Sequence, residues 1–109
     1  MYTQTEAYSV ANTIWQQLGG QRFSFMTGVK PVCYGEKDNK VYLLMSVGRN
    51  KNNINLFEVA YNEGKDTYEV RFIRKRGIEA HTIARFDDVY CDMLTTIFTQ
   101  YTGLKMAVA

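Results

Sequence analysis

The residues best suited to bind a charged ligand are the cations of the stretch 71–76, RFIRKR. In a strand, Arg71 points away from Val70 and Phe72, and the last three cations emerge together at the strand end. With the cations of a neighbouring loop they can bind phosphate backbones or an acidic protein surface. The candidate binding residues are Arg49, Lys51, Arg71, Arg74, Lys75 and Arg76, and Arg85 is a further member. The alternative interpretation is an edge strand whose charges prevent aggregation.

The side chains that could catalyse a reaction form no recognisable constellation. No local motif links the single histidine, His81, to a serine or cysteine nucleophile, and one histidine excludes an all-protein multi-histidine metal site. Asp88 and Asp92 have the spacing to share a helix face, but acids are also expected in a first helical turn, and further ligands are missing. We therefore predict neither an enzyme nor a bound metal or cofactor.

The stretch 17–28, QLGGQRFSFMTG, places three glycines close together, as phosphate-binding loops do. A phosphate-binding loop precedes a helix, so that free N–H groups and the positive end of the helix dipole face the anion. These glycines instead follow a helical pattern, whose carbonyl end repels phosphate, and precede a strand-like pattern. The stretch therefore predicts a helix that stops at Gly19 and Gly20, followed by a hairpin.

Length and composition indicate a single domain, residues 1–109, because 46% hydrophobic and 14% aromatic residues suffice for one core. A formal net charge of +2 identifies neither a nucleic-acid-binding nor a membrane protein by itself. No stretch approaches the roughly 18 apolar residues of a membrane span, and the N-terminus lacks the pattern of a signal peptide. We therefore expect a cytoplasmic protein without membrane contact. Cys33 and Cys91 match no metal spacing and are expected to be small, buried or half-buried apolar residues.

Apolar spacing predicts two amphipathic helices. Residues 5–18 carry apolar side chains at helical spacing, with polar side chains on the opposite side. The candidate caps of this helix are Thr3, Thr5 and Gly19. A wider apolar stripe over residues 89–101 predicts a second helix. Its candidate end residues are Asp87, Asp88 and Gly103.

Between these helices the apolar period changes to two, which is typical of strands. The strand-like runs cover residues 23–27, 41–45, 54–59 and 68–73. Residues 78–85 are ambiguous between a last strand and the entry to the second helix. Short connections favour an antiparallel meander, since parallel crossovers need about a dozen residues or more. The sequence thus predicts an α+β fold: an N-terminal helix, an antiparallel sheet of four to five strands and a C-terminal helix, with both helices on one sheet face.

The other sheet face is a candidate binding surface. Tyr42 and Tyr61 are candidates for exposure there, and aromatic rings interleaved with cations can stack nucleic-acid bases. Aromatic residues are equally common in small cores and protein interfaces, so they do not identify a ligand. A homodimer is also compatible with the apolar stripes, because two helices on a small sheet can leave one helix face uncovered.

Three segments together carry a family resemblance: QQLGGQRFSFMTGVK at 16–30, KDTYEVRFIRKRG at 65–77 and VYCDMLTTIFTQYTGL at 89–104. They resemble a family of small proteins encoded by bacteriophages, prophages and other mobile elements. The resemblance implies no catalytic residue; it implies a small phage-borne protein that acts by binding. We therefore expect a non-enzymatic binding protein whose target is host protein or nucleoprotein machinery that handles nucleic acid, as for an anti-CRISPR or another counter-defence inhibitor. The alternative is an accessory protein that binds DNA or RNA directly.

Overall fold

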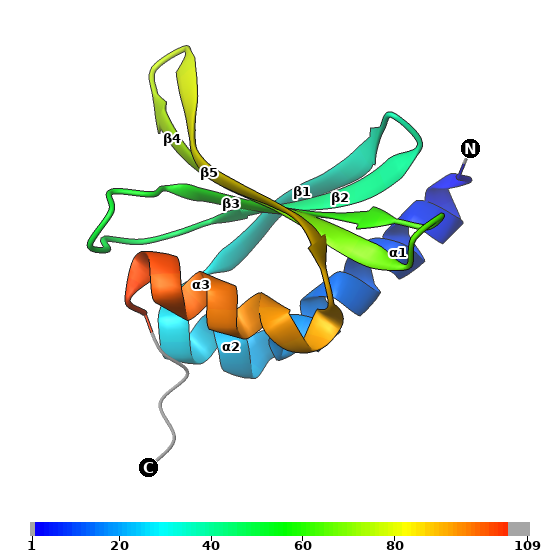
Figure 1. The fold of residues 1–109 in the computed structure, drawn as a ribbon, viewed down its shortest axis with the longest axis horizontal. Coiled ribbons are helices and arrows are strands. Elements are labelled where there is room, and N and C mark those ends of the chain that lie inside the picture. The colour runs from blue at the N-terminus through cyan, green and yellow to red at the C-terminus, as the bar shows by residue number, and fades with distance from the viewer. Residues whose placement is uncertain (1, 105–109) are drawn as a thin grey trace.

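A five-stranded antiparallel sheet carries the helices on one face (Figure 1). The computed structural model describes residues 2–104. In chain order the elements are α1 (Gln4–Leu18), α2 (Gly20–Thr27), β1 (Lys30–Lys37), β2 (Lys40–Ser46), β3 (Leu56–Asn62), β4 (Thr67–Arg76), β5 (Glu79–Val89), the 3₁₀ helix η1 (Cys91–Met93) and α3 (Leu94–Thr102). The strands lie in the order β1-β2-β3-β4-β5, so each pairs only with its sequence neighbours. The α+β meander predicted from the sequence is confirmed.

The predicted first helix is α1, and its start is fixed by a capping box. The Thr3 hydroxyl accepts a hydrogen bond from the Glu6 N–H at 3.1 Å, and the Glu6 carboxylate accepts one from the Thr3 N–H at 2.9 Å. The bond from the Thr3 backbone lowers the pKa of Glu6 below its ordinary value. The buried side chains recur at helical spacing: Ala7, Ala11, Ile14 and Leu18. Gly19 ends the helix in the left-handed conformation, at φ 119°.

The segment predicted as a first strand, residues 23–27, is helical instead. It forms α2, in which Phe23 is fully buried while Phe25 is 88% exposed. The Phe23 ring packs edge-on against Trp15 and Phe98, at centroid distances of 6.0 and 5.0 Å. Residues that are two positions apart on a helix lie on different faces, so only one of the two phenylalanines can reach the core. The prediction was wrong because the alternation in FSF fits a strand and a helix equally well.

The first strand is β1, which the sequence pattern missed. It lies at the sheet edge and is almost entirely exposed, so no apolar alternation marks it. The ladder with β2 shifts register between Pro31 and Cys33. A proline and a bulge are both typical of edge strands, where they discourage pairing with another chain. The turn into β2 is the pair Asp38 and Asn39, both with positive φ (54° and 63°), as a type I′ hairpin turn requires.

The remaining predicted strands are confirmed, with changed bounds. The run 41–45 lies inside β2, the run 54–59 overlaps β3, and the run 68–73 is the middle of a longer β4. The ambiguous residues 78–85 belong to β5.

The centre of the core is a group of aromatic rings under β3 and β4. Phe57 and Phe72 stack at 5.1 Å, and Phe98 of α3 packs against Phe57 at the same centroid distance. Tyr101 stacks on Phe72 at 5.2 Å. Such offset and edge-to-face pairs add to the burial of apolar area, so α3 closes the core beneath the centre of the sheet.

The helix predicted over 89–101 begins later than expected. Val89 ends β5, and the Asp87 and Asp88 carboxylates do not cap α3, whose N-cap residue is Met93 without a side-chain hydrogen bond. Asp88 has a positive φ of 56° and lies at the irregularity between Phe86 and Val89, where the ladder of β5 with β4 shifts register. The helix end at Gly103 is confirmed.

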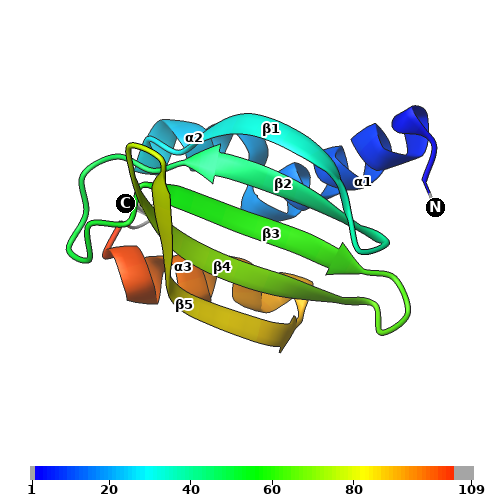
Figure 2. The same ribbon diagram turned by 90° about the horizontal axis from the view of Figure 1, so that it is seen from above.

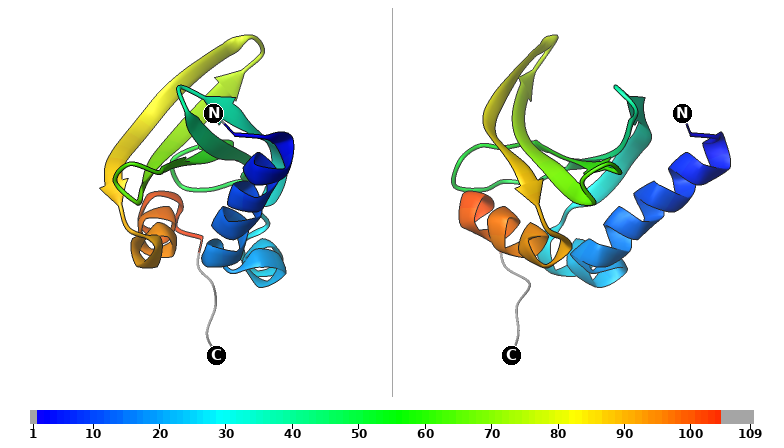
Figure 3. Two further views of the ribbon diagram at one scale, coloured as in Figure 1. Left: turned by 90° about the vertical axis from the view of Figure 1, so that its right-hand side faces the viewer. Right: turned by 45° about the vertical axis from the view of Figure 1, so that its right-hand side comes forward.

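The sheet is strongly curved. Seen from above, all five strands are visible and the helices lie behind them (Figure 2). The β1–β2 and β4–β5 hairpins both bend away from the helices, so the uncovered face is concave (Figure 3). The β4–β5 hairpin rises furthest from the sheet, on the side opposite the helices (Figure 1).

Candidate functional site

The β4–β5 hairpin carries cations at its projecting end. β4 continues past the buried Phe72 through Arg74, Lys75 and Arg76 before the turn into β5. Because strand residues alternate, Arg74 and Arg76 continue the face that carries Phe72, whereas Lys75 points to the opposite face. Lys75 and Arg76 are exposed and Arg74 is half-buried. Within residues 2–104, none of these three cations forms an ion pair with an acid.

The β2–β3 loop brings a further cation, Arg49, to the same place. The Asn50 side chain shapes this loop, donating to the Gly48 carbonyl at 2.8 Å and accepting from the Ile54 N–H at 3.1 Å. The Asn55 amide fixes the loop to β4, because it donates to the Lys75 carbonyl and accepts from the Lys75 N–H, both at 2.7 Å. Side chains from the loop and from β4 then line one hollow: Val47, Gly48, Arg49, Asn50, Asn53, Ile54, Asn55, Arg74 and Arg76.

The structure divides the six predicted binding residues. Arg49, Arg74 and Arg76 share this hollow, and Lys75 lies on the other side of the same strand. We call these four residues the hairpin cations. Lys51 lies apart, where its N–H donates to the Thr102 carbonyl at 3.4 Å beside the end of α3. Arg71 lies on the concave face and is paired with an acid, so it does not join the hairpin cations.

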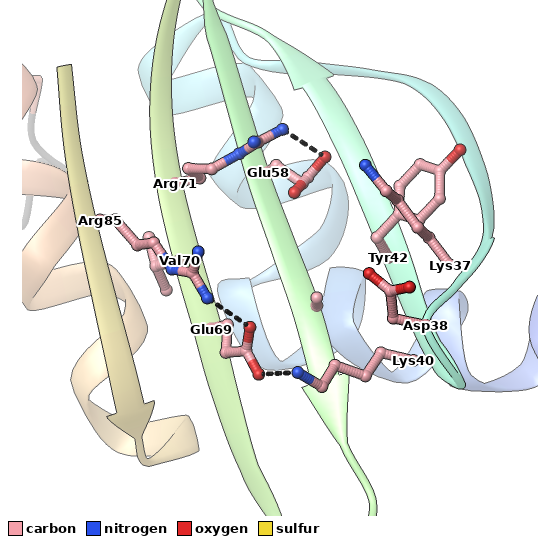
Figure 4. Close-up of a pocket in the computed structure, with 10 residues that line it drawn as sticks. Lys37, Asp38, Lys40, Tyr42, Glu58, Glu69, Val70, Arg71 and Arg85 are labelled. Carbon is pink, nitrogen blue, oxygen red and sulfur yellow. Dashed lines mark hydrogen bonds and ion pairs between the residues drawn. The ribbon is translucent and has the colours of Figure 1, made fainter. Parts of the chain in front are cut away.

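The concave face holds a second hollow, lined by charged side chains that pair with one another (Figure 4). The Glu69 carboxylate forms two ion pairs, with Lys40 at 2.5 Å on one side and with Arg85 at 3.3 Å on the other. Ala60 of β3, which pairs with Glu69 of β4, contributes only a methyl group, and this leaves room for the Lys40 side chain of β2 to cross β3 (Figure 4). Arg71 pairs with Glu58 at 3.3 Å. The charges at the centre of this face therefore largely neutralise each other, which disfavours it as a site for a polyanion.

Of the two tyrosines expected on this face, only Tyr42 lies there. Its ring covers Gly35 of β1, where an added Cβ would be 2.8 Å from the tyrosine oxygen. Tyr61 is on the helix-bearing side, packed against Tyr68 with ring centroids 5.3 Å apart. The Tyr61 hydroxyl donates to the Asp66 carboxylate at 2.6 Å, and this bond raises the pKa of Tyr61 to about 12. A single aromatic ring among paired ions is a poor platform for stacking bases.

The other candidate groups do not converge. His81 is exposed on β5 opposite Arg74, with its Nε2 3.6 Å from Glu79. Cys33 and Cys91 are both exposed, so the expectation that they are buried or half-buried was wrong. Asp88 lies in β5 and Asp92 in η1, so they do not share a helix face. Among the described residues, no group of three or more His, Cys, Asp or Glu side chains could hold a metal ion.

Two features of the site were missed by sequence reasoning. One is the pairing of Lys40 and Arg85 with Glu69, which depends on strand register and leaves no local sequence signal. The other is Ile78, a fully exposed residue in the β4–β5 turn. The sequence does contain a signal for this turn. Gly77 is the first residue of a two-residue loop between strand-like runs, and a glycine there is typical of a type II′ hairpin turn.

The fold and site define a small α+β protein with a charge-neutralised concave face and a cationic hairpin. Comparison with protein-family models gives no match, and neither the curated proteins nor the solved structures include a significant match. No helix of residues 2–104 combines the length and the apolar character needed to cross a membrane.

Proposed function

We propose that this protein is a non-enzymatic binding protein that binds nucleic acid directly through the hairpin cations. One observation carries the proposal. Arg49, Arg74 and Arg76 line one hollow, and Lys75 lies on the other face of the same strand, all without acid partners among the described residues. Lys40, Arg71 and Arg85 on the concave face are instead paired with acids.

The energetic reason is counterion release. Each cation that contacts a phosphate displaces a condensed counterion, and this supplies most of the affinity of sequence-independent binding. Cations already paired with a carboxylate must first lose that partner, so they contribute less. The hairpin cations are free of this cost, and the β4–β5 hairpin projects on the side away from the helices, where a long polymer can approach it (Figure 1).

The second candidate is a counter-defence inhibitor of phage or mobile-element origin, which occupies an acidic surface on host machinery that handles nucleic acid. The resemblance of three segments to phage-borne proteins favours it. So does the exposed Ile78 beside the cations, because an apolar side chain entering a pocket often anchors a protein interface.

The salt dependence of binding to a labelled DNA duplex tests the proposal. Four phosphate contacts predict that log K falls with log salt at a slope of about −3.6, which is a loss of about 150-fold between about 50 and 200 mM salt. The double variant Arg74→Gln/Arg76→Gln should reduce the slope to about −1.8. The matched control is Arg22→Gln/Lys30→Gln, which removes two exposed cations from other elements and should leave the slope unchanged.

Undetectable or salt-insensitive binding would refute direct nucleic-acid binding. A tagged protein that captures a host protein from nuclease-treated lysate, and loses it in the Arg74→Gln/Arg76→Gln variant, would support the counter-defence candidate instead.

A further inference from the structure

The apex of the β4–β5 hairpin presents a large apolar side chain to solvent. The loop between the strands is only Gly77 and Ile78, and the Ile78 side chain is fully exposed. Gly77 has a φ of 60°, which the first position of a type II′ turn requires and which glycine adopts without strain. The turn therefore holds Ile78 at the apex in a fixed place.

Exposing this isoleucine has no structural benefit within the chain. It contacts no core cluster, and a polar residue would serve equally well at this turn position. At the tip of a hairpin that carries cations, this side chain is accessible to any partner that the cations bind.

Cations flank this apex on both faces of the hairpin. Arg74 and Arg76 lie on one face and Lys75 on the other, by strand alternation. A ribbon with cations on both faces suits the two phosphate chains that border a groove.

We propose that the β4–β5 hairpin enters the minor groove of duplex DNA and that Ile78 inserts between base pairs as a wedge, which bends the duplex. This inference rests on the proposed function, since it names the partner and the consequence of binding through the hairpin cations. Apolar wedges of this kind partly unstack a base step and kink the duplex by about 20–90°.

Single-stranded nucleic acid fits the hairpin less well. Proteins that bind single strands stack successive bases on aromatic rings. Residues 74–81, RKRGIEAH, contain no phenylalanine, tyrosine or tryptophan. Duplex RNA also fits less well, because its minor groove is wide and shallow and gives a narrow ribbon no walls to contact.

Energy transfer between dyes at the two ends of a short DNA duplex tests the wedge. Binding of the unaltered protein should raise the transfer efficiency, because a bend brings the ends together. Ile78→Ala should bind with the same salt slope but leave the transfer efficiency at the value of free duplex. Ile78→Leu should restore the bend. The matched control is Ile83→Ala, which truncates another exposed isoleucine of β5 away from the apex and should bend DNA like the parent.

The outcomes separate the two proposals. If no duplex binds, the proposed function fails. If duplex binds with the predicted salt slope but Ile78→Ala bends it as the parent does, or if the parent causes no bend, the wedge is refuted while the proposed function stands. Tighter binding to single-stranded DNA or RNA, or to anionic lipid vesicles, than to duplex DNA would also refute the wedge.

Discussion

Replacing Phe23 and Phe25 separately by alanine distinguishes a helix from a strand over residues 20–27. On α2, Phe23 is fully buried between Trp15 and Phe98, while Phe25 is 88% exposed. On a strand, both side chains would point to the same face and both losses would be similar. The two variants remove the same atoms, so any difference between them reports on the environment of each ring.

The structure predicts very different losses of stability for the two variants. Removing a buried phenylalanine ring typically costs about 3–5 kcal/mol. With a urea slope of about 1.5 kcal/mol/M, Phe23→Ala should lower the unfolding midpoint by about 2–3 M. Phe25→Ala should change the free energy of unfolding by no more than about 0.5 kcal/mol, since the ring is exposed and alanine has the higher helix propensity.

Urea unfolding followed by fluorescence of the single tryptophan, Trp15, measures both variants, because this indole packs edge-on against Phe23. If Phe23→Ala is too unstable to purify, Phe23→Leu provides the same comparison, with an expected loss of about 1–2 kcal/mol. Equal losses in the Phe23 and Phe25 variants would refute the helical assignment of this segment.

Three further predictions concern the sheet. Gly35→Ala should destabilise the protein by about 1–3 kcal/mol, because the new Cβ would lie 2.8 Å from the Tyr42 oxygen. The control variant Gly48→Ala should not destabilise the protein, because nothing lies within 4 Å of its new Cβ. Equal unfolding midpoints of the two variants in urea would contradict this prediction. Glu69→Gln should lower the free energy of unfolding by about 1 kcal/mol, since it weakens two half-exposed ion pairs, and an unchanged midpoint would show that the pairs contribute nothing net. The pKa of Tyr61 rises from 10.0 to about 12 on folding, so stability should fall as pH increases through this window, and Tyr61→Phe should remove that part of the pH dependence of the melting temperature.

The sequence alone was sufficient to predict the helices and strands that bury one face and expose the other. α1 combines a capping box with a helical apolar stripe, and β2 alternates strictly between buried and half-buried residues. Local propensity and burial agree in these segments, so a pattern along the chain reveals them. β1 shows the opposite case: both of its faces are largely exposed, and an edge strand without a buried face leaves no period to detect.

The apolar stripe at 89–101 was misleading for a different reason. Val89 is buried because it ends β5 opposite Tyr68, and Tyr90 and Met93 are exposed. Apolar residues from a strand, a short 3₁₀ helix and α3 thus formed one apparent helical stripe. Only the tertiary structure assigns them to separate elements, because helical spacing alone does not show which neighbours a side chain meets.

For the candidate site, the sequence identified the cations but not their environments. Strand alternation placed Arg71 correctly on the face opposite Phe72. Arg71 pairs with Glu58, whereas Arg74 and Arg76 share a hollow with Arg49. This difference depends on the register of the strands and on the path of the β2–β3 loop. Such long-range geometry sets which cations are neutralised, and it is absent from any local pattern.

The position of α3 after all five strands has a consequence for synthesis on the ribosome. Each strand can pair with its predecessor as soon as it emerges, because the meander joins only sequence neighbours. The rings of Phe57 and Phe72 nevertheless stay uncovered until Phe98 and Tyr101 follow. A nascent chain that stalls within β5 would therefore display a curved sheet with an unprotected aromatic underside, and such surfaces recruit chaperones or aggregate. Synthesis of α3 is therefore the step that covers these rings and converts an aggregation-prone intermediate into the folded protein.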